Sequence, residues 1–293
     1  MGDGMRQPPR LMPALVTPFD RAGELELAHH RHNLGWLHDL GLGGFLLGGS
    51  TGEGPLLETG ERTALVRAAR AHLGRRPFLL VGVVAESVRQ ALGQIEEAEG
   101  ADGVLVLTPT TLARSSLPAQ RRFFTAVAEA SPLPVLLYSV PRNTGYALDE
   151  ELAVELSAHP NIVGMKDSGG DAVRVQRIVA AAGTEFSVFN GSTASVMLAM
   201  AGGAYGAITA STNYLPSRMS ELLALAKRRS PAANDLQTKL TGIAAHVESH
   251  GIGGVKAAAG HIGLRPGIPR LPLTEVSVQT IERSVLAALR KAT

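Results

Sequence analysis

The sequence contains no cysteine among its 293 residues. This absence excludes disulfide bonds, thiolate nucleophiles and metal sites with cysteine ligands. Long hydrophobic runs are also missing, because no stretch of 18 apolar residues occurs and the segment 1–10 lacks the apolar centre of a secretion signal. We therefore expect a cytoplasmic protein that is neither secreted nor embedded in a membrane.

The sequence also lacks an excess of charge of one sign. Lysine and arginine total 28 against 26 acidic residues, and the basic side chains are scattered along the chain. Such a balance gives no basic field for a nucleic-acid backbone, so we expect no nucleic-acid partner. With 45% hydrophobic and 18% charged residues, the chain has the composition of a globular protein with a sizeable core.

Short apolar runs recur along the first 210 residues, with amphipathic segments between them. The runs are mostly continuous rather than alternating, which is typical of strands buried on both faces. Eight strand–helix units in about 230 residues predict an α/β fold, a closed (β/α)8 TIM barrel, rather than a wide open sheet. The predicted strands are Pro13–Phe19, Gly43–Ser50, Phe78–Ala85, Gly103–Pro109, Val135–Val140, Ile162–Lys166, Phe186–Asn190 and Ala204–Ala210.

Helical spacing of apolar residues predicts the remaining elements. We expect a catalytic barrel over residues 1–215 and a helical C-terminal extension over 216–293, with no flexible linker between them. The predicted crossover helices include Glu58–Leu73, Leu117–Ala130, Leu148–Ala158 and Ala172–Ala182. In the extension we predict helices at Glu221–Arg229, Ala232–Ser249, Gly254–His261 and Thr274–Lys291, with a turn-rich segment at Leu264–Pro272.

Lysine is scarce, with five residues against 23 arginines, and Lys166 alone ends an apolar strand. Active sites of such barrels lie at the carboxyl ends of the strands. Burial there favours the neutral amine that can attack a carbonyl and form a Schiff base. The alternative interpretation, equally weighted on this run alone, is a lysine that reaches the rim or pairs with Asp167.

Two further strand ends carry groups that can bind an anion or transfer a proton. The segment Gly48–Glu53 presents successive backbone N–H groups, including that of Gly49, and the hydroxyls of Ser50 and Thr51, as expected for a carboxylate or phosphate site. It lacks the lysine of a nucleotide-binding loop, and a simple tight turn is an equally good interpretation. Tyr138, one of four tyrosines, can relay protons or act as an ordinary core residue.

Taken together, three segments resemble the dihydrodipicolinate synthase / N-acetylneuraminate lyase family of pyruvate-dependent class I aldolases. They are GGSTGE at 48–53, LYSVPRNTG at 137–145 and GMKDSGGD at 164–171. The resemblance covers nearly the whole chain, including the Val-Thr-Pro-Phe motif in the first apolar run and the helical extension. It implies a 2-oxo acid as substrate and a homo-oligomer, a tetramer built as a dimer of dimers.

The resemblance assigns roles to individual residues. It makes Lys166 the Schiff-base lysine, Tyr138 the proton relay, and Ser50 with Thr51 the donors to the pyruvate carboxylate. It also places the backbone carbonyls of Gly191 and Ile208 in the pocket wall. The imine between Lys166 and the substrate then acts as the electron sink, so no organic cofactor and no metal is expected.

The branch of the family is harder to assign, because substrate choice depends on a few side chains. The motifs look most like the 4-hydroxy-2-oxoglutarate aldolase branch, in which Ser168 would contact the distal carboxylate. Asn143 stands where dihydrodipicolinate synthases usually carry an arginine, which weakens the synthase alternative; the adjacent Arg142 is not assumed to be equivalent. A Schiff-base dehydratase or deaminase of a sugar-derived or proline-derived acid is a further alternative.

One departure from the family pattern affects the proton relay. Thr110 and Thr111 stand where the synthases and the oxoglutarate aldolases carry a Tyr-Tyr pair. One of those tyrosines normally extends the relay across a subunit interface, so Tyr138 lacks its usual partner here unless a threonine hydroxyl and water replace it. The expectation is a functional aldolase with a divergent substrate. A non-catalytic 2-oxo-acid sensor is the minor alternative.

Overall fold

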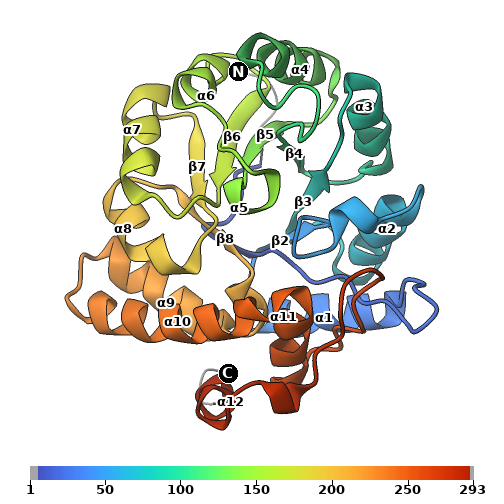
Figure 1. Ribbon diagram of the computed structural model, residues 1–293, viewed down its shortest axis with the longest axis vertical. Helices are drawn as coiled ribbons and strands as arrows, with labels where there is room; N and C mark the ends of the chain where they lie inside the picture. The colour runs from blue at the N-terminus through green and yellow to red at the C-terminus, as the bar shows by residue number, and fades with distance from the viewer. Residues whose placement is uncertain (1–5, 291–293) are drawn as a thin grey trace.

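The computed structural model describes residues 6–290 and shows eight parallel strands arranged as a nearly closed barrel with helices around it (Figure 1). The strands pair in the order β1-β8-β7-β6-β5-β4-β3-β2. A parallel bridge between Ala14 and Leu46 brings the first and last strands of this order together. The strands are β1 (Leu11–Pro13), β2 (Gly44–Leu47), β3 (Phe78–Val83), β4 (Gly103–Leu107), β5 (Val135–Ser139), β6 (Ile162–Asp167), β7 (Ser187–Asn190) and β8 (Gly206–Thr209).

The core consists of two clusters, one inside the barrel and one between the strands and the surrounding helices. Side chains on both faces of the strands are buried, as the continuous apolar runs predicted. The (β/α)8 prediction is therefore confirmed. The inner cluster contains Met12, Ala14, Leu46, Phe78, Leu80, Leu105, Leu107, Leu136, Tyr138, Val140, Phe189 and Ile208.

The first predicted strand, Pro13–Phe19, was wrong over most of its length. β1 ends at Pro13, although the residues that follow stay buried. The Asn213 side chain accepts a hydrogen bond from the Val16 N–H and donates one to the Ala14 carbonyl. A buried segment can leave the sheet here because this amide replaces the partners that a neighbouring strand would supply.

The crossover helices match the predicted amphipathic segments, with starts fixed by local caps. Leu117–Ala130 and Ala172–Ala182 have the predicted bounds, and Ser116 and Asp171 cap them. Glu58–Leu73 and Leu148–Ala158 were predicted too long, since these helices begin after Gly60 and Asp149. The helices of this part are α1 (Leu27–Asp39), α2 (Glu61–Leu73), α3 (Val88–Glu97), α4 (Leu117–Ala130), α5 (Pro141–Thr144), α6 (Glu150–Leu156), α7 (Ala172–Ala182) and α8 (Val196–Ala201).

The C-terminal extension forms α9 (Pro216–Lys227), α10 (Ala232–Ser249), α11 (Gly251–His261) and α12 (Arg283–Arg290), and α9 to α11 lie along one side of the barrel (Figure 1). Two predicted starts were too late: α9 begins at Pro216, a residue suited to a first helical turn, and α11 at Gly251.

The last predicted helix, Thr274–Lys291, was too long. Only Val278–Thr280, as a 3-10 turn, and Arg283–Arg290 are helical, and Lys291 lies outside the described residues.

Barrel and extension share one core. Leu215, Met219, Leu222, Val247 and Val255 belong to the same buried cluster as the outward faces of the strands. The division at residue 215 stays a prediction, because this shared core draws no boundary there. Among residues 6–290, no helix is both long and apolar enough to cross a membrane.

Candidate active site

Lys166 and Tyr138 face each other inside the barrel. They occupy paired positions on β6 and β5, so their side chains leave the sheet on the same face. The Lys166 Nζ lies 3.4 Å from the Tyr138 Oη and 4.5 Å from the centre of its ring. Each residue is only 4% exposed. The structure therefore brings an amine and a phenol into contact in a site that is largely shielded from water.

The Tyr138 hydroxyl has a second side-chain partner. Its oxygen lies 3.2 Å from the Ser50 Oγ, which comes from the loop after β2. Of the two interpretations left open for this tyrosine, the geometry fits the proton relay, since its hydroxyl bonds two polar side chains rather than the backbone. Lys166, Tyr138 and Ser50 thus form a connected hydrogen-bonded chain.

Asp167, which could have paired with Lys166, points away from it. Its carboxylate lies on the other face of β6 and binds the Arg174 Nε at 2.9 Å and the Gly169 N–H at 2.8 Å. Asp167 is 1% exposed, and Arg174 reaches it from α7. The acid therefore anchors β6 to α7, and the Lys166 amine has no carboxylate partner on its own strand.

Gly191 and Ser168 close the site around the lysine stem. A Cβ at Gly191 would lie 2.0 Å from the Ser168 Oγ and 3.0 Å from the Lys166 Cε. The Gly191 N–H donates to the Asp167 carbonyl at 2.6 Å, which holds the two strand ends together. Only glycine fits at 191 without displacing Ser168 or Lys166. These three residues, predicted as one site, are neighbours.

The loop after β2 is tightly folded, and two of its backbone N–H groups are left without an acceptor inside the loop. Gly48 has φ +58°, and a Cβ at Gly54 would lie 2.0 Å from the Gly48 carbonyl oxygen. Within the described residues, the backbone N–H groups of Ser50 and Thr51 have no assigned acceptor. Unused amides beside two hydroxyls form a concave donor site for an anion, next to the Tyr138 hydroxyl. Gly49 is buried in this turn.

The remaining predicted site residues differ in their placement. Ile208 on β8 is fully buried and belongs to the inner cluster that contains Tyr138. Asn143 lies exposed on the short helix α5, where its backbone N–H donates to the Val140 carbonyl at 2.9 Å. Its side chain makes no hydrogen bond to Lys166, Tyr138 or Ser50. The structure thus brings Ile208 to the barrel interior and leaves Asn143 at the rim.

Thr110 and Thr111 are held by a residue that the sequence did not suggest. The Glu86 carboxylate, after β3, accepts hydrogen bonds from the hydroxyl and the N–H of both threonines at 2.5 to 3.0 Å. Burial alone would raise the pKa of Glu86, but these hydrogen bonds outweigh it and hold the pKa below the usual glutamate value. Both hydroxyl protons are therefore donated to Glu86, and within the described residues neither threonine makes a hydrogen bond to the Tyr138 hydroxyl.

Glu248 is a second acid that the sequence gave no reason to single out. It lies near the end of α10, and the Tyr214 hydroxyl donates to its Oε1 at 3.1 Å. Burial raises the pKa of Glu248, opposed by the Tyr214 hydrogen bond and by the positive charges of Arg142 and Lys166. The carboxyl is thus close enough to Lys166 to respond to its charge.

Comparison with known proteins shows similarity over nearly the whole chain. The sequence profile described as Dihydrodipicolinate synthetase family matches residues 7–292. A 4-hydroxy-tetrahydrodipicolinate synthase of Exiguobacterium sibiricum is 35% identical over 271 residues, which cover 90% of this chain and 91% of the relative.

Two solved structures are also similar to this chain over nearly its whole length. A putative dihydrodipicolinate synthase from Thermus thermophilus superposes with a TM-score of 0.87 at 35% identity, covering 96% of this chain and 98% of that one. The chloride-inhibited dihydrodipicolinate synthase from Acinetobacter baumannii, solved in complex with pyruvate, gives a TM-score of 0.86 at 31% identity, with 96% and 97% covered.

Proposed function

Because the chain belongs to the dihydrodipicolinate synthetase family and is a class I aldolase that acts on pyruvate, we propose that it cleaves a 4-hydroxy-2-oxo acid, with 4-hydroxy-2-oxoglutarate as the type substrate, and releases pyruvate. The observation that carries the proposal is the 3.4 Å contact between the Lys166 Nζ and the Tyr138 Oη in a buried site. An amine and a phenol at this distance supply the nucleophile and the proton acceptor that a retro-aldol step requires.

The reaction begins when the neutral Lys166 amine attacks the C2 ketone, and loss of water gives an iminium. Tyr138 gives its phenol proton to the hydroxyl that leaves as water, and the resulting phenolate takes the proton of the C4 hydroxyl as the C3–C4 bond breaks. The bonding electrons move into the iminium and form an enamine, while C4 leaves as an aldehyde. Tyr138 delivers this proton to C3 of the enamine and recovers a proton as water hydrolyses the resulting imine to pyruvate and free Lys166. The imine is the only electron sink that the reaction needs, so no metal or organic cofactor is proposed.

The two ends of the substrate meet different parts of the site in this proposal. The carboxylate next to the ketone binds the free N–H groups and hydroxyls of Ser50 and Thr51, as the open amides of that loop support. The distal carboxylate accepts a hydrogen bond from Ser168, whose hydroxyl lies beside Gly191 and the Lys166 stem. The Gly49 turn and Ile208 form the wall of the pocket, and Asn143 contributes at the rim.

The substrate is tested by pyruvate release from 4-hydroxy-2-oxoglutarate, followed with lactate dehydrogenase and NADH. We expect turnover by the wild-type protein and none by Lys166→Ala. Ser168→Ala is expected to raise the KM by about ten-fold, since one hydrogen bond to a charged group is lost. Absence of pyruvate with this substrate would overturn the proposed cleavage.

A second candidate is the 4-hydroxy-tetrahydrodipicolinate synthase reaction, favoured by the names of relatives about 35% identical. It would use the same imine of pyruvate and condense its enamine with aspartate semialdehyde. Consumption of pyruvate only when that aldehyde is present would identify this reaction. Asn143 at the rim supports cleavage over condensation, because it stands where the synthases usually carry an arginine for their semialdehyde substrate.

We also propose that the protein is a cytoplasmic homo-oligomer, a tetramer built as a dimer of dimers. Leu112, next to the threonine pair, is 97% exposed, which supports burial of this segment against another copy. Light scattering coupled to size-exclusion chromatography is expected to give four times the mass of one chain. A monomer at micromolar concentration would contradict the proposal.

A further inference from the structure

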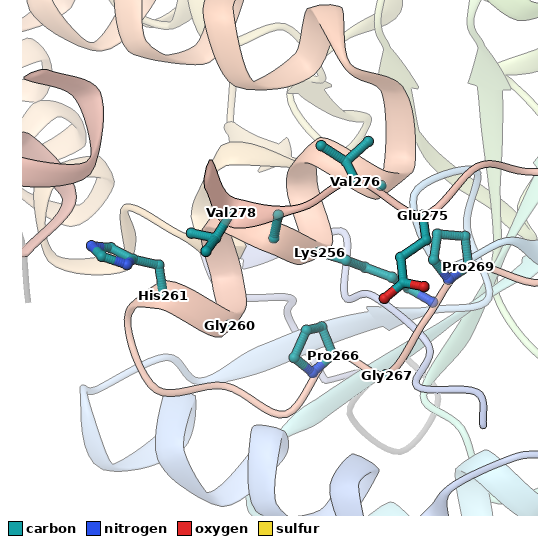
Figure 2. A pocket seen from close by; sticks show the side chains of 11 residues that line it. Lys256, Gly260, His261, Pro266, Gly267, Pro269, Glu275, Val276 and Val278 are labelled. Atoms are coloured by element: carbon teal, nitrogen blue, oxygen red, sulfur yellow. The ribbon is translucent and has the colours of Figure 1, made fainter. Parts of the chain in front are cut away.

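A second lysine is buried outside the reacting centre. Lys256 lies on α11 and is 2% exposed. Its Nζ is 2.5 Å from the Oε1 of Glu53, and both side chains are almost completely inaccessible. The same ammonium donates a hydrogen bond to the Ile268 carbonyl at 2.7 Å. Figure 2 shows the side chain leaving α11 and running toward Pro269, on the wall of a cavity in the extension.

Glu53 is held by the extension at its second oxygen as well. The Arg270 N–H donates to the Glu53 Oε2 at 2.8 Å. The guanidinium of Arg270 also donates to the Leu56 carbonyl at 2.6 Å and stacks 4.0 Å above the Phe19 ring. Lys256 and Arg270 of the extension therefore both bind the loop after β2 from outside the barrel.

These contacts fix Glu53, which belongs to the same turn as Ser50 and Thr51. Glu53 has φ +59°, a left-handed conformation that is unfavourable for a residue other than glycine. Its N–H donates to the Ser50 carbonyl at 3.1 Å, which closes the turn. Such a conformation persists where surrounding contacts fix it, and the buried carboxylate supplies those contacts.

Burying the charges of Glu53 and Lys256 costs free energy, so a purely structural role explains this pair poorly. Taking a carboxylate and an ammonium out of water is compensated only by close geometry and further hydrogen bonds. Burial lowers the pKa of Lys256, while the Glu53 charge and hydrogen bond oppose that shift. Apolar side chains of similar size often stabilise a contact as well as a buried ion pair does, so stability alone does not account for Glu53 and Lys256.

We propose that Glu53 and Lys256 are positioning residues that hold the Ser50–Thr51 amides in the arrangement that binds the substrate carboxylate. The helical extension is then part of the pyruvate site, although it contributes no atom to the reaction. The inference rests on the proposed function, because it needs pyruvate to bind at this loop.

The test compares Lys256→Met with a double variant, Glu53→Gln with Lys256→Met. Methionine keeps much of the lysine stem that lines the cavity in Figure 2, and the double variant leaves no unpaired buried charge. Lys239→Met, at an exposed position of α10, is the matched control. The readouts are the pyruvate concentration that gives half-maximal borohydride-trapped imine, the yield at saturation, and the melting temperature.

We expect the half-saturating pyruvate concentration to rise about ten-fold or more in both Lys256 variants, since a small displacement of a binding group has effects of this size. The saturating yield of imine should stay complete, because Lys166 and Tyr138 are untouched. The double variant should melt near the wild-type temperature, and Lys239→Met should resemble the wild type throughout.

A purely structural role predicts a different pattern, in which the double variant recovers both the melting temperature and the half-saturating pyruvate concentration. That result would overturn the inference alone, as would a fall in saturating yield with unchanged half-saturation. If Lys256→Met does not fold, the double variant decides by the same readouts. Failure of the wild-type protein to form any imine would instead overturn the proposed function, and the inference with it.

Discussion

Neighbouring residues of strand β6 face opposite sides of the barrel wall. Lys166 points inward to the Tyr138 hydroxyl, while Asp167 points outward to Arg174. Strand geometry requires this alternation, and it separates the amine from the nearest acid in the sequence. Lys166 is thus surrounded by the Tyr138 phenol, Gly191 and the Ser168 hydroxyl.

Removal of the phenol tests the proton relay directly. We expect Tyr138→Phe to lower kcat for aldol cleavage by about 10² to 10⁴, the usual contribution of a positioned acid or base. Imine formation with pyruvate should persist, because Lys166 keeps its place. Tyr205→Phe is the control, since that hydroxyl binds the Pro8 carbonyl instead. Wild-type kcat in Tyr138→Phe would contradict the role.

A second prediction concerns the lack of room for a side chain at Gly191. Gly191→Ala places a Cβ against Ser168 and Lys166, and we expect it to lose about 1 to 3 kcal/mol of stability through overpacking, together with most activity. Gly93→Ala on α3, where a Cβ meets nothing within 4 Å, should be neutral or stabilising. Urea denaturation measures both. Equal effects of the two substitutions would contradict this account.

Single side chains mark the limit of what the sequence predicts. Lys166 stood out because it is a rare lysine at the end of an apolar strand, and Tyr138 because it lies within a neighbouring strand. Glu86, Glu248 and Lys256 carry no such signal, since none of them ends an apolar strand: Glu86 lies in a loop, and Glu248 and Lys256 lie on helices. Their partners are brought close only by the packing of distant segments, which local patterns do not encode.

At the scale of elements, the loops after β3 and β4 are joined by one carboxylate. Glu86 accepts four hydrogen bonds from Thr110 and Thr111, and these bonds favour its charged form and hold its pKa below the usual glutamate value. A carboxyl with a depressed pKa stabilises the folded state above its ordinary titration range, and that contribution disappears as the pH falls through the depressed pKa.

We therefore expect Glu86→Gln to lower stability at pH 7 by no more than about 1 kcal/mol, because an amide NH2 cannot accept from the threonines and the site is largely exposed. The difference from wild type should begin to shrink as the pH falls below the ordinary glutamate pKa of about 4.3, and should vanish below the depressed pKa of the folded protein. Thermal melting at several pH values measures it, with the exposed Glu99→Gln as control. A difference that grows toward low pH would contradict the assignment.

Element types were predictable, while several ends were not. Continuous apolar runs indicated the strands because a parallel sheet buries both faces. The run Pro13–Phe19 was equally apolar, yet most of it lies outside the sheet, where Asn213, from the turn after β8, bonds the Val16 N–H and the Ala14 carbonyl. The segment 274–277 likewise packs without being helical, since the Thr274 carbonyl lies directly against Gly253.

At the scale of the whole molecule, barrel and extension are joined by polar and apolar contacts. Asn33 on α1 exchanges two hydrogen bonds with the Arg265 backbone, and Trp36 lies against Gly263. A shared core predicts one cooperative unfolding transition. Trp36 is the only tryptophan, so its fluorescence reports on this junction.

We expect fluorescence and far-ultraviolet circular dichroism to give the same denaturation midpoint in urea. The dichroism follows all helices, whereas the fluorescence follows the contact between α1 and the extension. A fluorescence transition at clearly lower urea would show that the extension detaches first, and would contradict a single cooperative core.

The proposed reaction depends on an imine between Lys166 and pyruvate. Borohydride reduction in the presence of pyruvate, followed by intact mass measurement and peptide mapping, tests it most directly, with Lys166→Ala as the control. We expect one stable adduct per chain, located at Lys166 and absent from the variant. A well-folded wild-type protein that gives no adduct, or an adduct at Lys256 or another amine, would contradict it.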